Sequence, residues 1–124
     1  MRKEKAMFHH IGLRVKDLEA AVRLYTVMLA PLGHVPGAAD ASYAGFGPKG
    51  KPALWLHKDA AASGAHVAFR APDRKAVDEF HRQGIRAGAR DNGKPGVRSE
   101  YAPDYYGAFL IDLDGNNVEA VCMS

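Results

Sequence analysis

The stretch HIGLRVKD, residues 10–17, returns 56 residues later as HVAFRAPD, residues 66–73. In both copies polar and apolar residues alternate as in a β-strand, and apolar residues at helical spacing follow, to Tyr25 in the first copy and to His81 in the second. The aspartate that ends each stretch suits the N-cap of that helix. Because no gap is needed to align the copies, the sequence predicts one structural unit used twice.

Short strand-like segments follow each predicted helix, separated by turns that contain proline or glycine. The predicted strands are residues 7–15, 35, 43–46 and 53–57 in the first half, and residues 66–71, 86–89, 106–113 and 117–123 in the second half. We expect the last two to form a hairpin through Asp114-Gly115-Asn116. Residues 90–104 contain several turn signals and are expected to be mostly loop, with a length typical of a lid or binding loop.

This order of elements predicts an α+β fold made of two βαβββ modules, about residues 7–58 and 64–124, joined by a linker of small residues. The 124-residue length and 47% hydrophobic content fit a single domain over residues 1–124. The net charge of +3 owes much to three basic residues within residues 1–5, and no helix carries a basic stripe. We therefore expect no nucleic-acid partner.

Cys122 is the single cysteine, so no disulfide forms within the chain and a reducing compartment is expected. No apolar run approaches the length that crosses a membrane, and no signal peptide follows the charged first residues. The sequence thus favours a cytoplasmic protein without a membrane partner.

Three side chains are candidate metal ligands. His10 and His66 hold equivalent places at the start of the two copies, on the strand face opposite the apolar one, and Glu119 stands in a mostly apolar strand. Two imidazoles and a carboxylate suit a divalent Zn, Fe, Mn, Co or Ni ion with open positions for substrate. In the alternative reading, the histidines form ordinary hydrogen bonds and Glu119 pairs with Arg14 or Arg70.

Other side chains suit substrate binding. Arginines favour an anionic substrate, and aromatic side chains with polar tips favour a pocket wall. Tyr105 and Tyr106 cannot both face one pocket from the same strand, and we favour Tyr106. The candidate substrate-binding residues are Arg14, Tyr43, Trp55, Arg70, Arg98, Tyr101 and Tyr106.

Three stretches together resemble the vicinal oxygen chelate superfamily, which includes glyoxalase I, extradiol dioxygenases, fosfomycin-resistance thiol transferases and bleomycin-binding proteins. They are residues 10–17 with the following helix, residues 66–69 with the following helix, and FLIDLDGNNVE at residues 109–119. The last is the most specific, because members typically end in an Asp-Pro-Asp-Gly hairpin followed by a strand with the metal-binding glutamate. Leu113 replaces that proline here, which affects the stiffness of the turn and leaves the ligand in place.

The resemblance implies a curled mixed sheet around a cavity with helices on the outside, and His10, His66 and Glu119 as metal ligands. It also implies a homodimer. In short members the site often forms between two chains, so the sequence leaves open whether His10 joins His66 and Glu119 of the same chain or of a second subunit. Glyoxalase I adds a carboxylate on the last strand of the first module, where alignment places Leu54, beside Trp55. Neither residue can bind a metal or accept a proton, so glyoxalase I activity is disfavoured.

We therefore expect a metal-dependent enzyme, a lyase or isomerase, transferase or dioxygenase, that chelates a small molecule through two neighbouring oxygens. The sequence leaves isomerisation, thiol addition and ring-cleaving oxygenation open and identifies no general base. His57 becomes a fourth ligand if the strand register differs from our alignment. The alternative is a small-molecule binding or drug-resistance protein without catalytic activity on the same fold.

Overall fold

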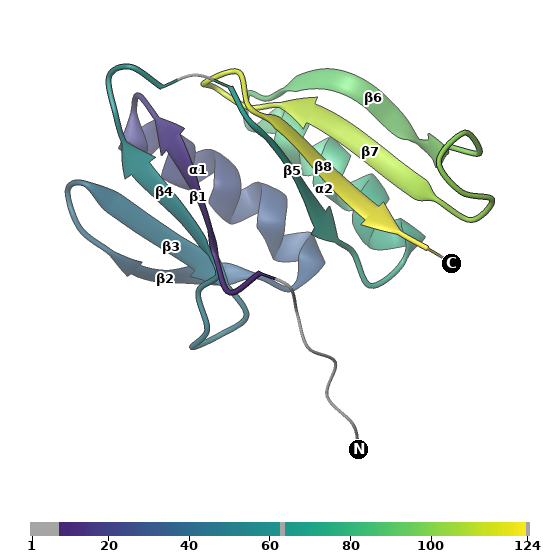
Figure 1. Ribbon diagram of the computed structural model, residues 1–124, viewed down its shortest axis with the longest axis horizontal. Coiled ribbons are helices and arrows are strands. Elements are labelled where there is room, and N and C mark those ends of the chain that lie inside the picture. The colour runs from purple at the N-terminus through teal and green to yellow at the C-terminus, as the bar shows by residue number, and fades with distance from the viewer. Residues whose placement is uncertain (1–7, 63, 124) are drawn as a thin grey trace.

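The computed structural model describes residues 8–62 and 64–123, so Met7, the first residue of the first predicted strand, lies outside the described residues. Two βαβββ modules follow one another along the chain (Figure 1). The first contains β1 (Ile11–Val15), α1 (Leu18–Leu29), the short 3-10 helix η1 (Ala30–Leu32), β2 (Val35–Ala39), β3 (Tyr43–Gly47) and β4 (Leu54–Lys58). The second contains β5 (His66–Arg70), α2 (Arg74–Arg86), β6 (Arg90–Val97), β7 (Tyr106–Ile111) and β8 (Asn117–Cys122).

Each module forms its own four-stranded mixed sheet, with strand orders β1-β4-β3-β2 and β5-β8-β7-β6. The parallel pairs are β1 with β4 and β5 with β8, and the other neighbouring strands are antiparallel. Both helices lie behind the sheets in Figure 1 and contact each other. The predicted α+β fold with two βαβββ modules is confirmed, with two open sheets in place of one continuous sheet.

The alternation in each strand sorts its side chains between two faces. Leu13 and Val15 are buried against the helices, whereas Gly12 and Arg14 are exposed on the other side of β1. We call the side of each sheet that points away from the helices its open face. In the first module it carries Gly12, Arg14, Tyr43, Trp55 and His57, and in the second His66, Ala68, Arg70, Phe109 and Glu119.

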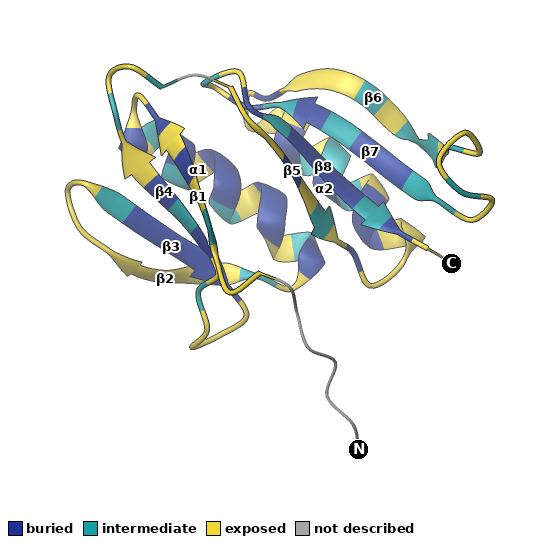
Figure 2. Ribbon diagram, viewed as in Figure 1, coloured by how far each residue is buried: buried dark blue, intermediate teal, exposed yellow. Residues whose placement is uncertain are grey.

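The helices begin as the sequence predicts. Asp17 and Asp73 accept hydrogen bonds from the backbone N–H groups of Ala20 and Ala76, at 3.1 and 2.8 Å. Figure 2 shows β3, β7 and β8 mostly buried and the edge strand β2 exposed along its length. Sheet centres and helix faces therefore form the core.

The modules are joined through their helices and the last hairpin. Asp112, at the hairpin, is buried and accepts a 2.7 Å hydrogen bond from the Tyr25 hydroxyl of α1. The backbone N–H and the side-chain amide of Asn116 both donate to the same carboxylate at 2.8 Å. Burial, followed by the Asp112 charge, raises the pKa of Tyr25 well above its ordinary value, so the phenol stays a donor.

Two local expectations are wrong. Residues 90–97, predicted as loop, form the edge strand β6, because irregular pairing around Gly93 and Gly96 absorbs the turn residues and an edge strand tolerates Pro95. Residues 86–89, predicted as a strand, are the end of α2 and a turn at Gly88, whose φ is +110°. The loop between β6 and β7 is accordingly shorter than expected.

Candidate metal and substrate site

His66 and Glu119 lie on the neighbouring strands β5 and β8, where Ala68 pairs with Glu119. The Nε2 atom of His66 is 3.3 Å from Oε1 of Glu119, and the Nδ1 atom is 3.0 Å from the backbone carbonyl oxygen of Asn117. A carbonyl only accepts, so Nδ1 carries a proton and, in the neutral ring, Nε2 presents a lone pair to the carboxylate. Two lone pairs at this distance repel unless a proton or a metal cation lies between them.

Glu119 is nearly enclosed, with 3% of its side chain exposed. The hydroxyl of Tyr105 donates a hydrogen bond to Oε2, which leaves Oε1 directed at His66. Burial, together with this hydrogen bond, raises the pKa of Tyr105, so the phenol keeps its proton. The alternative pairing of Glu119 with Arg14 is not formed, because Arg14 lies 3.7 Å from Asp59 instead.

A further unpaired oxygen belongs to the same face of β8. Asn117 precedes Glu119 by two residues in β8 and therefore shares its strand face. Its Oδ1 atom is buried and has no hydrogen-bond partner in the described part of the chain. The imidazole nitrogen of His66 and the carboxylate oxygen of Glu119 are donors that fit a divalent cation of the zinc-to-manganese range, and the Asn117 amide oxygen is a further oxygen donor on the same strand face.

His10, the remaining predicted ligand, does not join them in the single chain. It precedes β1, it is exposed, and its Nδ1 lies 3.0 Å from Nδ1 of His9. Within residues 8–62 and 64–123, no three His, Cys, Asp or Glu side chains gather around one point. One chain thus brings together two of the three predicted ligands.

Aromatic and basic side chains surround the pair. The ring of Phe109 stacks on His66 at a centroid distance of 6.5 Å, and the guanidinium of Arg98 lies 5.4 Å from the centre of the Phe109 ring. Arg98 also donates to the backbone carbonyls of Lys94 and Gly96, at 2.7 and 2.9 Å. The structure thus places Arg98, one of the predicted substrate-binding residues, at the edge of this site.

Tyr105 and Tyr106 face opposite sides of the sheet, and the one at the site is not the one that we predicted. Tyr105 contacts Glu119, and the exposed Tyr101 packs edge-on against Tyr105 at 5.0 Å. Tyr106, which we favoured, points to the helix side of β7, where its hydroxyl donates to Asp78 at 2.6 Å. The reason is register, because Tyr106 pairs with the buried Cys122 on the helix-facing side of β8. Tyr106 is therefore not a residue of this site.

Comparison with known structures supports the same fold. The chain matches a crystal structure of a glyoxalase/bleomycin resistance protein from Albidiferax ferrireducens T118 at 28% identity and a TM-score of 0.82, over 94% of this chain and 98% of that one. The chain is similar in fold to structures of the glyoxalase/bleomycin resistance protein/dioxygenase family, which supports the resemblance to the vicinal oxygen chelate superfamily. No protein-family model and no curated protein matches the sequence.

More distant structures share the fold. A glyoxalase/bleomycin resistance protein/dioxygenase family enzyme from Burkholderia phytofirmans PsJN matches at 16% identity and a TM-score of 0.72, over 94% of this chain and 98% of that chain. A glyoxylase/bleomycin resistance protein/dioxygenase domain from Frankia sp. EAN1pec matches at 20% identity and a TM-score of 0.70, over 98% and 100%. Both likenesses extend over nearly the whole chain.

Within this vicinal oxygen chelate fold, the first module holds Trp55 where the second holds Glu119. Gly12 pairs with Trp55 as Ala68 pairs with Glu119, and the glycine and alanine are equivalent in the sequence repeat. Our alignment placed Leu54 there, but Leu54 is buried on the helix side. The register corrects the position by one residue, and the conclusion that no second carboxylate stands there is unchanged.

Trp55 lies flat on the open face of the first module. A Cβ atom at Gly45 would stand 2.6 Å from its ring, so only glycine leaves room for it, and Tyr43 packs against it edge-on at 5.7 Å. His57 lies two residues further along β4, and its ring stands 3.4 Å from the place of a Cβ at Gly12. This face is an aromatic surface with one imidazole.

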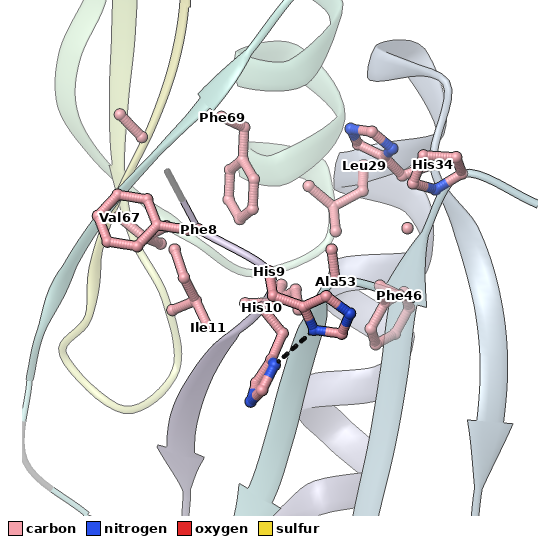
Figure 3. A pocket seen from close by; sticks show the side chains of 14 residues that line it. Phe8, His9, His10, Ile11, Leu29, His34, Phe46, Ala53, Val67 and Phe69 are labelled. Carbon is pink, nitrogen blue, oxygen red and sulfur yellow. Dashed lines mark hydrogen bonds between the residues drawn. The ribbon is translucent and has the colours of Figure 1, made fainter. Parts of the chain in front are cut away.

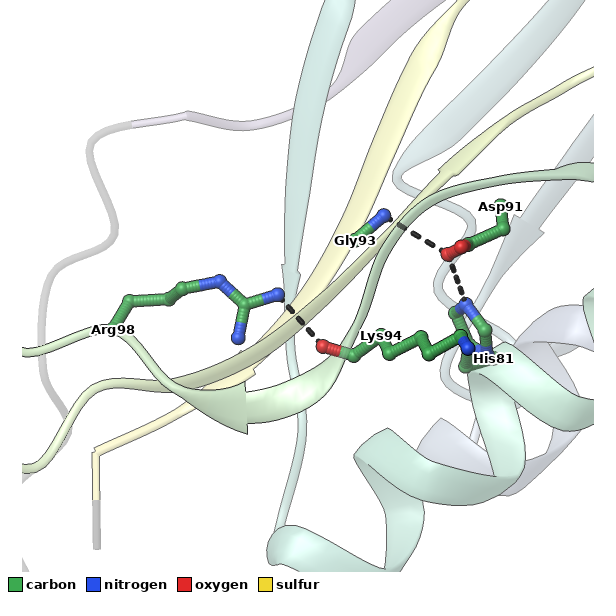
Figure 4. A network of polar contacts seen from close by, with 5 residues as sticks. All are labelled: His81, Asp91, Gly93, Lys94 and Arg98. Carbon is green, nitrogen blue, oxygen red and sulfur yellow. Dashed lines mark hydrogen bonds and ion pairs between the residues drawn. The ribbon is translucent and has the colours of Figure 1, made fainter.

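A polar network that sequence reasoning missed connects α2 to β6 (Figure 4). The Nε2 atom of His81 lies 2.8 Å from Oδ1 of Asp91, which also accepts the backbone N–H of Gly93 at 3.0 Å. The Gly93 N–H and then the His81 bond lower the pKa of Asp91. The network holds the bulged strand β6 against α2, and Arg98 follows directly after the end of that strand.

Among the described helices, none has the length and hydropathy needed to cross a membrane.

Proposed function

We propose that this chain is a metal-dependent enzyme that acts on a small molecule chelated through two oxygens to a divalent metal ion. His66 and Glu119 hold the ion, and His10 of a second copy supplies the third protein ligand. The observation that carries this proposal is the Nε2 atom of His66, which faces a buried carboxylate oxygen at 3.3 Å while Nδ1 is engaged by a backbone carbonyl. Metal-binding histidines are typically oriented by such a second hydrogen bond.

The bound ion would supply Lewis-acid stabilisation of negative charge on the substrate oxygens. Asn117 holds the His66 ring and its tautomer, and Tyr105 holds Glu119 with one oxygen free. Because Tyr105 keeps its proton, it is a positioning residue and not a general base. Arg98 stands near Phe109 and suits an anionic substrate group.

The first module narrows the reaction type. Trp55 occupies the place where glyoxalase-type isomerisation requires a metal-bound carboxylate to move a proton. An indole has no group that accepts a proton. Thiol addition and oxygenation therefore fit these residues better than that isomerisation. Arg14 and Arg70, both exposed on the open faces, suit an anionic substrate that lies between two such faces.

Metal binding is tested on chelator-stripped protein titrated with Zn²⁺, Co²⁺ or Mn²⁺ by calorimetry, followed by elemental analysis. His66→Ala and Glu119→Gln should each weaken binding at least a hundredfold, and Tyr105→Phe about tenfold, because it releases the ligand that it orients. His81→Ala, which removes an imidazole on α2 that is bonded to Asp91 and not to the site, is the matched control. Undiminished metal affinity in both ligand variants would refute the site.

The shared site has its own test. A homodimer whose sites combine His10 of one subunit with Glu119 of the other should regain metal binding when His10→Ala and Glu119→Gln proteins are unfolded and refolded together. Random pairing restores about a quarter of the sites, because half of the dimers are mixed and each of these holds one intact site. If the mixture binds no more than the separate variants, each site lies within one chain or His10 is not a ligand.

A second function is favoured by one observation, the flat Trp55 flanked by Tyr43. A non-catalytic protein that binds or sequesters a planar drug would use this aromatic surface and need no metal. Binding of a planar compound that is lost in Trp55→Ala but unaffected by a chelator would favour this function over the enzyme.

We also propose that residues 1–124 form one domain of a cytoplasmic protein. The single, buried Cys122 supports a reducing compartment, where stability does not depend on disulfides. Limited proteolysis, which should cut the linker at residues 59–65 no faster than other exposed turns, tests the single domain.

A further inference from the structure

The imidazole rings of His9 and His10 meet just before β1, where both line a cavity between the two modules (Figure 3). Consecutive side chains of an extended strand point to opposite faces, but a bend at His9 turns these two rings toward each other. Their Nδ1 atoms are 3.0 Å apart, and the ring planes are nearly perpendicular at 87°. Both residues are exposed, so packing in the core does not impose this contact.

One proton lies between the two Nδ1 atoms. Two bare nitrogens at this distance would repel each other through their lone pairs, and two N–H groups would clash. In the neutral pair, one ring therefore donates from Nδ1 and leaves its Nε2 bare, while the other ring accepts at Nδ1 and carries its own proton on Nε2. The contact thus holds His9 and His10 in opposite tautomers.

Only one of the two arrangements suits a metal ligand. Nε2 of His10 binds an ion when it is bare, which requires that His10 donates its Nδ1–H and that His9 accepts it. With the roles reversed, Nε2 of His10 carries a proton and has no lone pair for the ion. Metal-binding histidines are typically oriented by a hydrogen bond from the other ring nitrogen, and Nδ1 of His9 is such an acceptor for His10.

The sequence repeat shows that the two modules orient their histidines differently. In the second module, Nδ1 of His66 lies 3.0 Å from the backbone carbonyl oxygen of Asn117, and no histidine precedes His66. The equivalent carbonyl of the first module belongs to Ala53, and among the described residues it makes no hydrogen bond to His10. His9 therefore takes the place that a backbone carbonyl has in the second module.

We propose that His9 is a positioning residue of the metal centre, which accepts the Nδ1–H of His10 and so keeps Nε2 of His10 bare for the ion. This inference rests on the proposed function, in which His10 is the third protein ligand. It assigns His9 no contact with the ion or with the substrate.

NMR of the histidine ring nitrogens in the full chain measures the tautomers, because protonated and bare imidazole nitrogens differ in chemical shift. Spectra are recorded at a pH at which both rings are neutral, before and after saturation with Zn²⁺. In the metal-free chain His9 and His10 should be in opposite tautomers. In the Zn²⁺-bound chain Nδ1 of His10 and Nε2 of His9 should carry the protons, and Nδ1 of His9 should be bare.

Two variants at position 9 separate the hydrogen bond from the bulk of the side chain. His9→Asn supplies an amide oxygen as acceptor, so it should keep the tautomer of His10 and bind Zn²⁺ as the parent does. His9→Phe keeps a ring but has no acceptor, so His10 should lose its fixed tautomer and the affinity for Zn²⁺ should fall about tenfold. His81→Phe, which removes an imidazole that is bonded to Asp91, is the control and should change neither measurement.

Three results would overturn the inference. The first is a Zn²⁺-bound chain in which Nδ1 of His10 is bare, which is measured on the parent and does not depend on the folding of any variant. The second is a tautomer of His10, or an affinity for Zn²⁺, that His9→Phe leaves unchanged. The third is an affinity that His10→Ala leaves unchanged, because His10 is then not a ligand.

These outcomes differ from a failure of the proposed metal site. A parent chain that binds no Zn²⁺, or whose affinity survives both His66→Ala and Glu119→Gln, refutes the site and the inference with it. A parent that binds Zn²⁺ through His66 and Glu119 while His10 has its proton on Nε2 refutes the inference alone.

Discussion

Tyr25→Phe tests how the first module is fastened to the second. The substitution removes one oxygen from a side chain that is 0% exposed and deletes its 2.7 Å hydrogen bond to the carboxylate of Asp112. The backbone N–H and side-chain amide of Asn116 still donate to Asp112, so the carboxylate is left short of one donor and not bare. A hydrogen bond to a charged group contributes about 1.5–3 kcal/mol. We expect the free energy of unfolding to fall by about 2 kcal/mol, about thirtyfold in the folded-to-unfolded ratio.

The loss should depend on pH with a defined sign. The pKa of Tyr25 is raised in the folded state, by burial first and by Asp112 second, whereas the unfolded tyrosine titrates near pH 10. The stabilisation is thus fully present below about pH 10 and is lost as the pH rises further, because only the unfolded state releases the proton. At about pH 11 one such proton lowers the stability of the parent by about 1.4 kcal/mol. The phenylalanine variant lacks this titration, so the difference between the two proteins should shrink to about 0.6 kcal/mol.

Urea unfolding of both proteins at about pH 7 and about pH 11, with equal m-values, measures the effect. Tyr101→Phe, at a 61% exposed tyrosine, is the control and should change stability by less than about 0.5 kcal/mol. The reasoning is refuted if Tyr25→Phe costs no more than this control at neutral pH, or if its cost stays constant up to about pH 11.

Two further substitutions test local contacts. The Gly93 N–H and His81 lower the pKa of Asp91, so the contribution of Asp91 to folding stability is present above about pH 4 and is lost on acidification. His81→Phe removes part of this contribution. The urea midpoint of the variant should therefore fall less steeply between about pH 5 and pH 2 than that of the parent. Gly45→Ala should displace the Trp55 ring from β3, because the new Cβ would stand 2.6 Å from that ring. Trp55 is the single tryptophan, so the fluorescence of the protein should shift to longer wavelength. An unchanged spectrum would contradict the packing of Trp55 on Gly45.

The repeat made the architecture predictable. Equal spacing of two strand-helix units fixes the order of elements, and the aspartate caps at Asp17 and Asp73 are local signals that packing does not override. The edge strand β6 was missed because Gly93 and Pro95 indicate a turn in an isolated sequence, and only the neighbouring strand shows that bulges accommodate them.

The side chains that sequence reasoning placed on the wrong face are those whose orientation depends on pairing between strands. The choice between Tyr105 and Tyr106 depends on which face β7 presents, and Ala108 and Leu110, both 0% exposed, put Tyr106 with them on the helix side. That signal was present in the sequence as alternation. The position of His10 was not predictable in the same way, because a repeat shows that His10 and His66 hold equivalent places in the two modules and not that their side chains meet at one point.

The two open faces carry different side chains at equivalent positions of the same backbone fold. The layer Gly12, Trp55 and Gly45 in the first module corresponds to Ala68, Glu119 and Phe109 in the second. In the first module the bulky ring stands on the central strand and needs glycine on one neighbour. In the second the bulk has moved to the neighbouring strand, which leaves space for a carboxylate in the middle and for the His66 ring beside it. Under the proposed function, the second module would supply the metal ligands, and Trp55 and Tyr43 of the first would form an aromatic wall for the substrate.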